Sequence, residues 1–334
     1  MKTMTAAQPN HPTHRLLGGA LFLGVALVMG AGCAGSAYLA GQRKPLPVGP
    51  GVNHQEGSFE GKGGVRLFEQ SWQPQGSPAK AVLIIVHGLK DHSDRYAAVA
   101  ERLVARGYAV HAFDLRGHGD SEGDRVWVSS FDDYLDDLAL FVARVQQAEP
   151  GRPLFLFGHS MGGAIVTLFT LARAPQLRGL VLSGAALNTD RVSGFLRGTT
   201  KVLGSIAPTL AVLKLDDEAF SRDPAVISEM KADPLVYDGA GPARTAKELL
   251  KAVERIQKRM EALAVPLLAL HGGADAVTNP EGSRQLVQRA RSTDKTLKIY
   301  DGLFHDLLHE PEKDKVTSDL CDWLDARVEH NPAR

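Results

Sequence analysis

The sequence has very few cysteines and no excess of charge of either sign. Its 334 residues include two cysteines, and 38 basic residues balance 38 acidic ones. Two cysteines cannot build a disulfide framework or a cysteine-type metal site. A balanced charge without a basic cluster argues against a surface that binds nucleic acid. We therefore expect no metal, no organic cofactor and no nucleic-acid partner, and a substrate that is small or uncharged overall.

The N-terminal segment also lacks charge. Residues 16–40 contain no charged side chain, and Lys2 and Arg15 precede them, which is typical of an export signal or membrane anchor. The apolar run ends in Met-Gly-Ala-Gly-Cys-Ala and resembles a bacterial lipoprotein signal in which Cys33 is lipidated. An uncleaved anchor is the second interpretation, since this run is long enough to span a bilayer, and an ordinary cleaved signal is the third. We expect a chain held at a membrane of the bacterial cell envelope.

Three prolines mark residues 41–56 as an extended tether. After the tether, short apolar runs alternate with longer amphipathic stretches, which predicts a mostly parallel sheet with helices on both faces. The expected strands lie at 65–72, an edge strand, and at 81–87, 108–114, 154–158, 180–183, 265–271 and 296–300; expected helices include 131–147, capped by Ser129 or Ser130, and 280–290.

The regular alternation stops between residues 187 and 264. This stretch contains one clear amphipathic helix, expected at 247–263, and no strong strand pattern. An insertion between two strands of a regular sheet predicts a cap. We therefore divide the chain into a signal or anchor segment at 1–40, a tether at 41–56, an α/β core at 57–186 and 265–330, and a cap at 187–264.

The strongest chemical signal is the segment Gly158-His159-Ser160-Met161-Gly162. It follows an apolar strand and opens a helix, so the GxSxG pattern of a nucleophile elbow stands in the context that it requires. The turn is so tight that side chains at Gly158 and Gly162 would clash. The same turn lifts the hydroxyl of Ser160 clear of the sheet. We predict that Ser160 is the nucleophile of a serine hydrolase.

A serine hydroxyl is a weak nucleophile near neutral pH, so it needs a base, and the base needs an orienting acid. In this fold the chain order is serine, acid, histidine. Asp275 follows the penultimate expected strand, and His305 follows the last one. His309 is the alternative base, but its position four residues later favours a place in or beside the next helix. We predict a triad of Ser160, Asp275 and His305.

Hydrolysis of an ester also requires backbone donors for the oxyanion. The amide of Met161 lies at the start of the helix after the nucleophile, where the helix dipole favours negative charge. The second donor should come from the loop after the strand at 81–87, and Leu89 is the candidate, since Gly88 permits a close turn there. We expect His87 to support this loop rather than to catalyse.

Six segments together are similar to one known family. They resemble, in order, the monoacylglycerol lipase family of α/β-hydrolases, from Gly64 to the C-terminal helix: VHGLKDHSDRY, FDLRGHGDSEG, GHSMGG, SRDPAVISEMKADPLVY, VPLLALHGGADAVTNPEGS and DKTLKIYDGLFHDLLHE. The resemblance implies an α/β-hydrolase fold, the same triad, and the amides of Leu89 and Met161 as oxyanion donors. The N-terminal anchor and a cap without cysteines depart from the family.

The resemblance also implies a function and gives the cap a role. We expect hydrolysis of monoacylglycerols to fatty acid and glycerol, with an apolar inner face of the cap guiding the acyl chain; the candidates are Leu203, Ile206, Leu210, Val212, Leu213 and Leu215. Lysophospholipase or general carboxylesterase activity would use the same triad. A non-catalytic binding lipoprotein is the alternative from another class. Peptide hydrolysis would need a charged group in the cap, and Asp216, Asp217 and Glu218 form the cluster to test.

Overall fold

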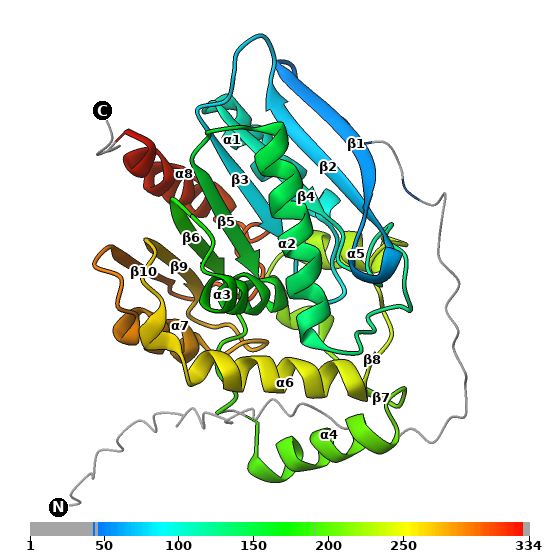
Figure 1. Ribbon diagram of the computed structural model, residues 1–334. Helices are drawn as coiled ribbons and strands as arrows, with labels where there is room; N and C mark the ends of the chain where they lie inside the picture. The colour runs from blue at the N-terminus through cyan, green and yellow to red at the C-terminus, as the bar shows by residue number, and fades with distance from the viewer. Residues whose placement is uncertain (1–42, 44–45, 191, 330–334) are drawn as a thin grey trace, which may run out of the picture.

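The fold is built on one eight-stranded sheet (Figure 1). The computed structural model describes residues 43, 46–190 and 192–329, so the expected anchor segment and Cys33 lie outside the described residues. The strands are β1 (Val52–Glu60), β2 (Arg66–Pro74), β3 (Ala81–Val86), β4 (Tyr108–Phe113), β5 (Leu154–His159), β6 (Gly179–Ser183), β9 (Leu267–Gly272) and β10 (Lys295–Tyr300). Their spatial order is β1-β2-β4-β3-β5-β6-β9-β10, and the last six strands in this order are parallel. The expected mostly parallel sheet is confirmed.

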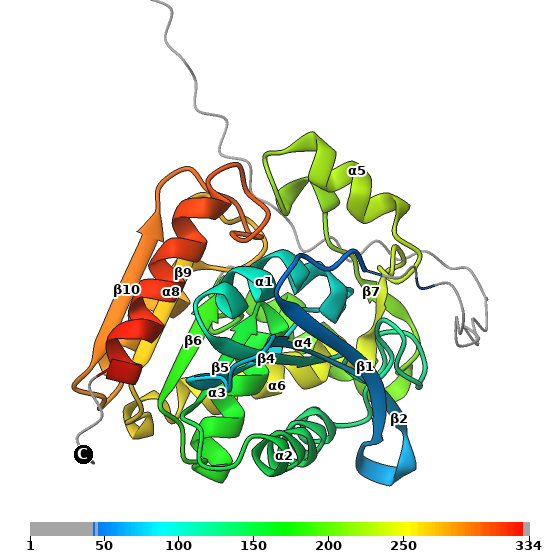
Figure 2. The same ribbon diagram turned by 90° about the horizontal axis from the view of Figure 1, so that it is seen from above.

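Helices cover both faces of the sheet, as expected (Figure 2). On one face lie α1 (Ala97–Ala105) and α8 (Lys313–Glu329), and on the other lie α2 (Phe131–Ala148), α3 (Met161–Arg173) and α7 (Pro280–Arg289). Every residue of β3, β4 and β5 is buried, because the helices cover these central strands on both sides. The Ser130 hydroxyl accepts from the Asp132 amide and caps α2.

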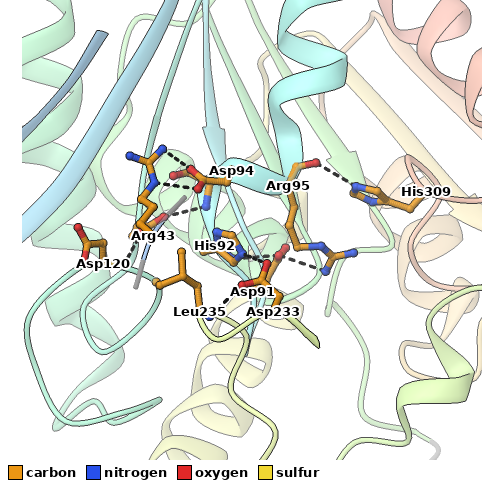
Figure 3. A network of polar contacts seen from close by, with 12 residues as sticks. Arg43, Asp91, His92, Asp94, Arg95, Asp120, Asp233, Leu235 and His309 are labelled. Atoms are coloured by element: carbon orange, nitrogen blue, oxygen red, sulfur yellow. Dashed lines mark hydrogen bonds and ion pairs between the residues drawn. The ribbon is translucent and has the colours of Figure 1, made fainter. Parts of the chain in front are cut away.

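The first part of the sheet differs from the prediction. β2 is not an edge strand, because β1 pairs with it antiparallel and forms the edge. Residues 52–56 of the expected tether therefore belong to the sheet. The pairing places the ring of His54 on that of Trp72 at 5.1 Å between centroids. Arg43 also contacts the core, since it makes a 2.6 Å ion pair with Asp94 (Figure 3). Apolar and polar residues alternate only weakly in β1, so its pairing with β2, rather than its own sequence pattern, makes this segment a strand.

The described residues between β6 and β9 form three helices and a small two-stranded sheet. The helices are α4 (Gly194–Ile206), α5 (Pro224–Ala232) and α6 (Ala243–Gln257), and the strands are β7 (Ala211–Leu213) and β8 (Gly241–Pro242). Of the three helices, only α6 was predicted, and it starts and ends earlier than expected. The sequence did not predict α4, because the helix contains three glycines, which disfavour helices, and because apolar side chains lie on its exposed face. Asp223 caps α5 and Pro224 occupies its first turn, a start signal that could have revealed this helix.

In the part of the chain that the structure describes, no helix is both long and apolar enough to span a membrane.

Candidate active site

Ser160 lies at the sharp turn between β5 and α3. Its backbone is left-handed, with φ 53° and ψ −117°, a conformation that costs free energy for a residue with a side chain. The flanking glycines make the turn possible. A Cβ at Gly158 would lie 2.5 Å from the carbonyl oxygen of Gly162, and one at Gly162 would lie 2.2 Å from the carbonyl oxygen of Val86. The turn therefore requires glycine at both positions.

Asp275 and His305 come together from the loops after β9 and β10. The Nδ1 of His305 lies 2.8 Å from Asp275 Oδ2, and both side chains are fully buried. The other carboxylate oxygen, Oδ1, accepts hydrogen bonds from the amides of Val277 and Thr278, each at 2.8 Å. Burial opposes ionisation of Asp275, but the charge of His305 and hydrogen bonds from His271 and His305 outweigh it and lower the pKa of the carboxyl. Asp275 is therefore ionised and fixes the orientation of the imidazole.

The two candidate bases differ in what their ring nitrogens contact. The Nε2 of His305 is buried and has no hydrogen-bond partner among the described residues. In His309, Nδ1 lies 2.8 Å from Asp306 Oδ1. Its Nε2 lies 2.9 Å from the carbonyl oxygen of Arg95 (Figure 3). His309 therefore has no nitrogen left for a proton transfer. Burial alone would lower the pKa of His305, but the charge of Asp275 and its hydrogen bond raise it.

His305 lies beside the nucleophile turn. Its ring centroid is 4.7 Å from that of His159, the residue before Ser160. The ring also packs against Gly184, where a Cβ would lie 3.2 Å from His305 Nδ1. Gly184 follows Ser183, whose carbonyl oxygen accepts a 3.0 Å hydrogen bond from the Ser160 amide. The structure thus pairs Asp275 with His305 and places them beside the turn that holds Ser160, at the carboxyl edge of the sheet, where open α/β sheets place their sites; among the described residues, His305 Nε2 makes no hydrogen bond to Ser160.

The loop after β3 approaches the nucleophile from the other side. We call residues 87–92 the oxyanion loop. A Cβ at Gly88 would lie 3.1 Å from Ser160 Cβ, so the loop touches the nucleophile. His87 supports the loop: its Nε2 accepts from the Leu115 amide at 2.9 Å, and its Nδ1 therefore carries the proton that it donates to the Gly88 carbonyl at 2.7 Å. Leu89 is buried in this loop, and Met161 is the first residue of α3, whose N-terminal amides a helix leaves unpaired.

A buried polar network that includes Asp91 of the oxyanion loop was not predicted from the sequence. Arg95 lies between two carboxylates, 3.3 Å from Asp91 (Figure 3) and 2.7 Å from Asp306. The hydroxyl of Tyr96 donates to Asp91 at 2.8 Å. Burial alone would raise the pKa of Asp91, but the charge of Arg95 lowers it to about 2. No local pattern reveals this network, because Asp306 lies 211 residues from Arg95.

His271 was also missed. Its Nε2 lies 3.2 Å from Asp275 Oδ2, and its Nδ1 contacts the Ser283 hydroxyl at 2.7 Å. A histidine at the end of a strand gives no signal by itself, since its role depends on the acid four residues later.

The elbow, the acid–histidine pair and the sheet order define the class of protein, a serine hydrolase of the α/β-hydrolase fold. The sequence profile of the Hydrolase_4 family, described as serine aminopeptidase, S33, matches residues 77–312. The chain belongs to this family, within its monoacylglycerol lipase-like members, and it is a serine hydrolase that acts on esters.

Several relatives support this assignment. The chain is 40% identical to a monoacylglycerol lipase of Mycolicibacterium smegmatis over 270 residues, which cover 80% of this chain and 96% of the relative. It is 36% identical to the human monoglyceride lipase over 269 residues, 79% of this chain and 88% of the relative. The crystal structure of a Paleococcus ferrophilus monoacylglycerol lipase aligns with a TM-score of 0.70 at 31% identity, covering 79% of this chain and 99% of that one. The resemblance noted from the motifs is confirmed.

Proposed function

We propose that the protein hydrolyses monoacylglycerols to fatty acid and glycerol through an acyl-enzyme on Ser160. The observation that carries the proposal is the geometry around His305, whose Nδ1 is held by Asp275 at 2.8 Å while its Nε2 is buried and unpartnered beside the serine turn. Relatives named monoacylglycerol or monoglyceride lipase supply the substrate class.

The mechanism follows from these positions. The Oγ of Ser160 attacks the ester carbonyl carbon, and its proton passes to His305 Nε2. The amides of Leu89 and Met161 donate to the oxyanion of the tetrahedral intermediate. When the intermediate collapses, the carbon–oxygen bond to glycerol breaks and glycerol takes the proton from His305. Water then attacks the acyl-enzyme and loses its proton to His305. When this second intermediate collapses, the bond to Ser160 Oγ breaks, Oγ takes the proton back from His305, and the fatty acid is released.

The test is glycerol release from a series of monoacylglycerols by the full chain in detergent, with a Ser160→Ala variant as control. We expect turnover by the wild type and a loss in kcat of about 10⁶-fold in the variant. A lysophosphatidylcholine of the same acyl chain belongs in the series. Faster turnover of that substrate would contradict the proposed substrate class and favour a lysophospholipase. An intact fold that hydrolyses no ester would contradict the proposal altogether.

We further propose that residues 1–40 hold the enzyme at a membrane, with Cys33 as a lipidated N-terminus. The support is the uncharged run and the small residues before the cysteine. A Cys33→Ser variant separates the interpretations when membrane fractions are compared. If Cys33 is lipidated, mass spectrometry should find acyl groups on the purified wild type and none on Cys33→Ser, and the variant should be released from the membrane. Retention without acyl groups in both proteins would support the uncleaved anchor instead.

A further inference from the structure

Lys90 occupies an unusual position in the oxyanion loop. It follows Leu89 directly, and its φ of 65° is a left-handed conformation that favours glycine. The side chain is nevertheless a long, charged one, and it is only 6% exposed. Lysine is rarely buried unless it is paired. A lysine kept beside the candidate oxyanion donor in a strained conformation therefore calls for a partner.

The described residues place a carboxylate near the ammonium of Lys90 but give it no hydrogen bond. Among the described residues it makes one ion pair, with Asp217 Oδ1 at 4.0 Å, and no hydrogen bond. That distance is beyond the 2.7–3.2 Å range of an N–H···O bond. Asp217 belongs to a short 3-10 helix of the cap, Asp217–Ala219. Within the described part of the chain, the three N–H donors of Lys90 thus approach the cap at Asp217 but have no hydrogen-bond acceptor.

Charges of both signs act on Lys90. Burial lowers the pKa of Lys90, the carboxylates of Asp217 and Asp238 raise it, and Lys214 lowers it. Asp217, at 4.0 Å, already supplies negative charge to this ammonium, so Lys90 does not require a charged ligand. A neutral oxygen can accept a hydrogen bond from Lys90 without adding a charge.

We propose that Lys90 is a specificity-determining residue that donates hydrogen bonds to neutral oxygens in the alcohol part of the ester, the hydroxyls of a glycerol ester. The inference rests on the proposed function and deepens it, because it assigns the choice of alcohol to one side chain. Lys90 would then distinguish three esters. A neutral glycerol ester offers it acceptors without charge, an acyl glycerophosphate adds charge, and a methyl ester offers no hydroxyl.

The experiment compares kcat/KM of the full chain for three substrates with one acyl chain: the monoacylglycerol, the methyl ester and the acyl glycerophosphate. Lys90→Met keeps the length of the side chain and removes its donors. We expect a 10- to 100-fold loss for the monoacylglycerol and a change below about 3-fold for the methyl ester, since a charged hydrogen bond is lost with only one of them. Lys214→Met, which removes an exposed ammonium from the same group of charges, is the matched control and should leave the ratio of the two substrates unchanged.

Two further variants keep the test decisive. Lys90→Gly relieves the left-handed backbone and should show the same loss of selectivity, even if the methionine variant folds poorly. Lys90→Arg keeps the donors and should restore part of the preference for the glycerol ester. A structural role of Lys90 would lower kcat/KM equally for both esters, and that result would overturn the assignment. So would a wild-type preference for the acyl glycerophosphate that disappears in Lys90→Met.

The outcome for the wild type separates this inference from the proposed function. If the wild type hydrolyses the methyl ester but leaves the monoacylglycerol intact, the proposed function and the role of Lys90 both fail. If the wild type prefers the monoacylglycerol and the Lys90 variants keep that preference, the proposed function stands and the assignment of Lys90 alone fails.

Discussion

The catalytic edge of the core and the outer face of the cap are constrained very differently. At Gly162 in α3, an added Cβ would lie 2.2 Å from a backbone oxygen, whereas at Gly198 in α4 an added Cβ would find no atom within 4 Å. The apolar side chains of the two helices differ in the same way: Leu168 in α3 is fully buried, and Phe195 in α4 is 83% exposed. Catalysis thus depends on core positions where no larger side chain fits, whereas the outer face of α4 has room for substitutions.

The largest effect should come from the acid of the core site. In Asp275→Asn, His305 loses the charge that orients it, and the imidazole can adopt the wrong tautomer. We expect kcat to fall about 10⁴-fold at neutral pH. Asp301→Asn, an exposed acid on the neighbouring turn, is the matched control and should keep full activity in the same ester assay. Equal losses in both variants would remove the acid role from Asp275.

The second prediction concerns the glycines of the two helices. Gly162→Ala should destabilise the fold by about 3 kcal/mol or more, because the new methyl group meets the backbone of β3. Gly198→Ala should stabilise it by about 0.5–1 kcal/mol, since alanine favours the helix and the site is open. Urea unfolding of both variants measures the difference. Similar changes in the free energy of unfolding would mean that the turn is looser than the structure indicates.

The third prediction is the pH dependence of the core site. His305 must be neutral to accept the proton of Ser160, and its pKa is raised above the ordinary value of 6.5. Activity should therefore be present above this pKa and fall about tenfold per pH unit below it. The measurement is kcat/KM for a neutral ester between pH 5 and 9. A midpoint below 6.5 on the acid side would contradict the pairing with Asp275.

The smallest effect should come from the cap surface. Phe195→Ala should change the free energy of unfolding by less than about 0.5 kcal/mol, because little apolar surface is buried there. Leu168→Ala, its counterpart in α3, should cost about 2–5 kcal/mol. A large loss from Phe195→Ala would show that this face is covered in solution.

The same contrast explains what could be predicted from the sequence. The positions of Ser160, Asp275 and His305 follow from strand ends and chain order, because the parallel sheet gathers those ends at one edge. The elbow glycines follow from steric limits on a tight turn. These signals are local or depend on order alone, so a single sequence contains them.

The remaining features depend on tertiary contacts. Ile206 was expected on the inner face of the cap, yet it is 75% exposed, while Val212 and Leu213, candidates for the same face, are buried. The apolar pattern of α4 does not tell which side packs on α6. In the same way, the ion pair of Lys90 is made with Asp217 of the cap, 127 positions further along the chain, and no local sequence pattern predicts a contact over that separation.

Covalent trapping tests the role of Ser160 as nucleophile most directly. The full chain is treated with a phosphonate ester that carries an alkyl chain, and the protein is then analysed by intact mass and peptide mapping. If Ser160 is the nucleophile, one adduct per chain forms, on the peptide that contains Ser160, and none forms in Ser160→Ala. An adduct on another residue, or one that persists in Ser160→Ala, would contradict the assignment of Ser160 as the nucleophile.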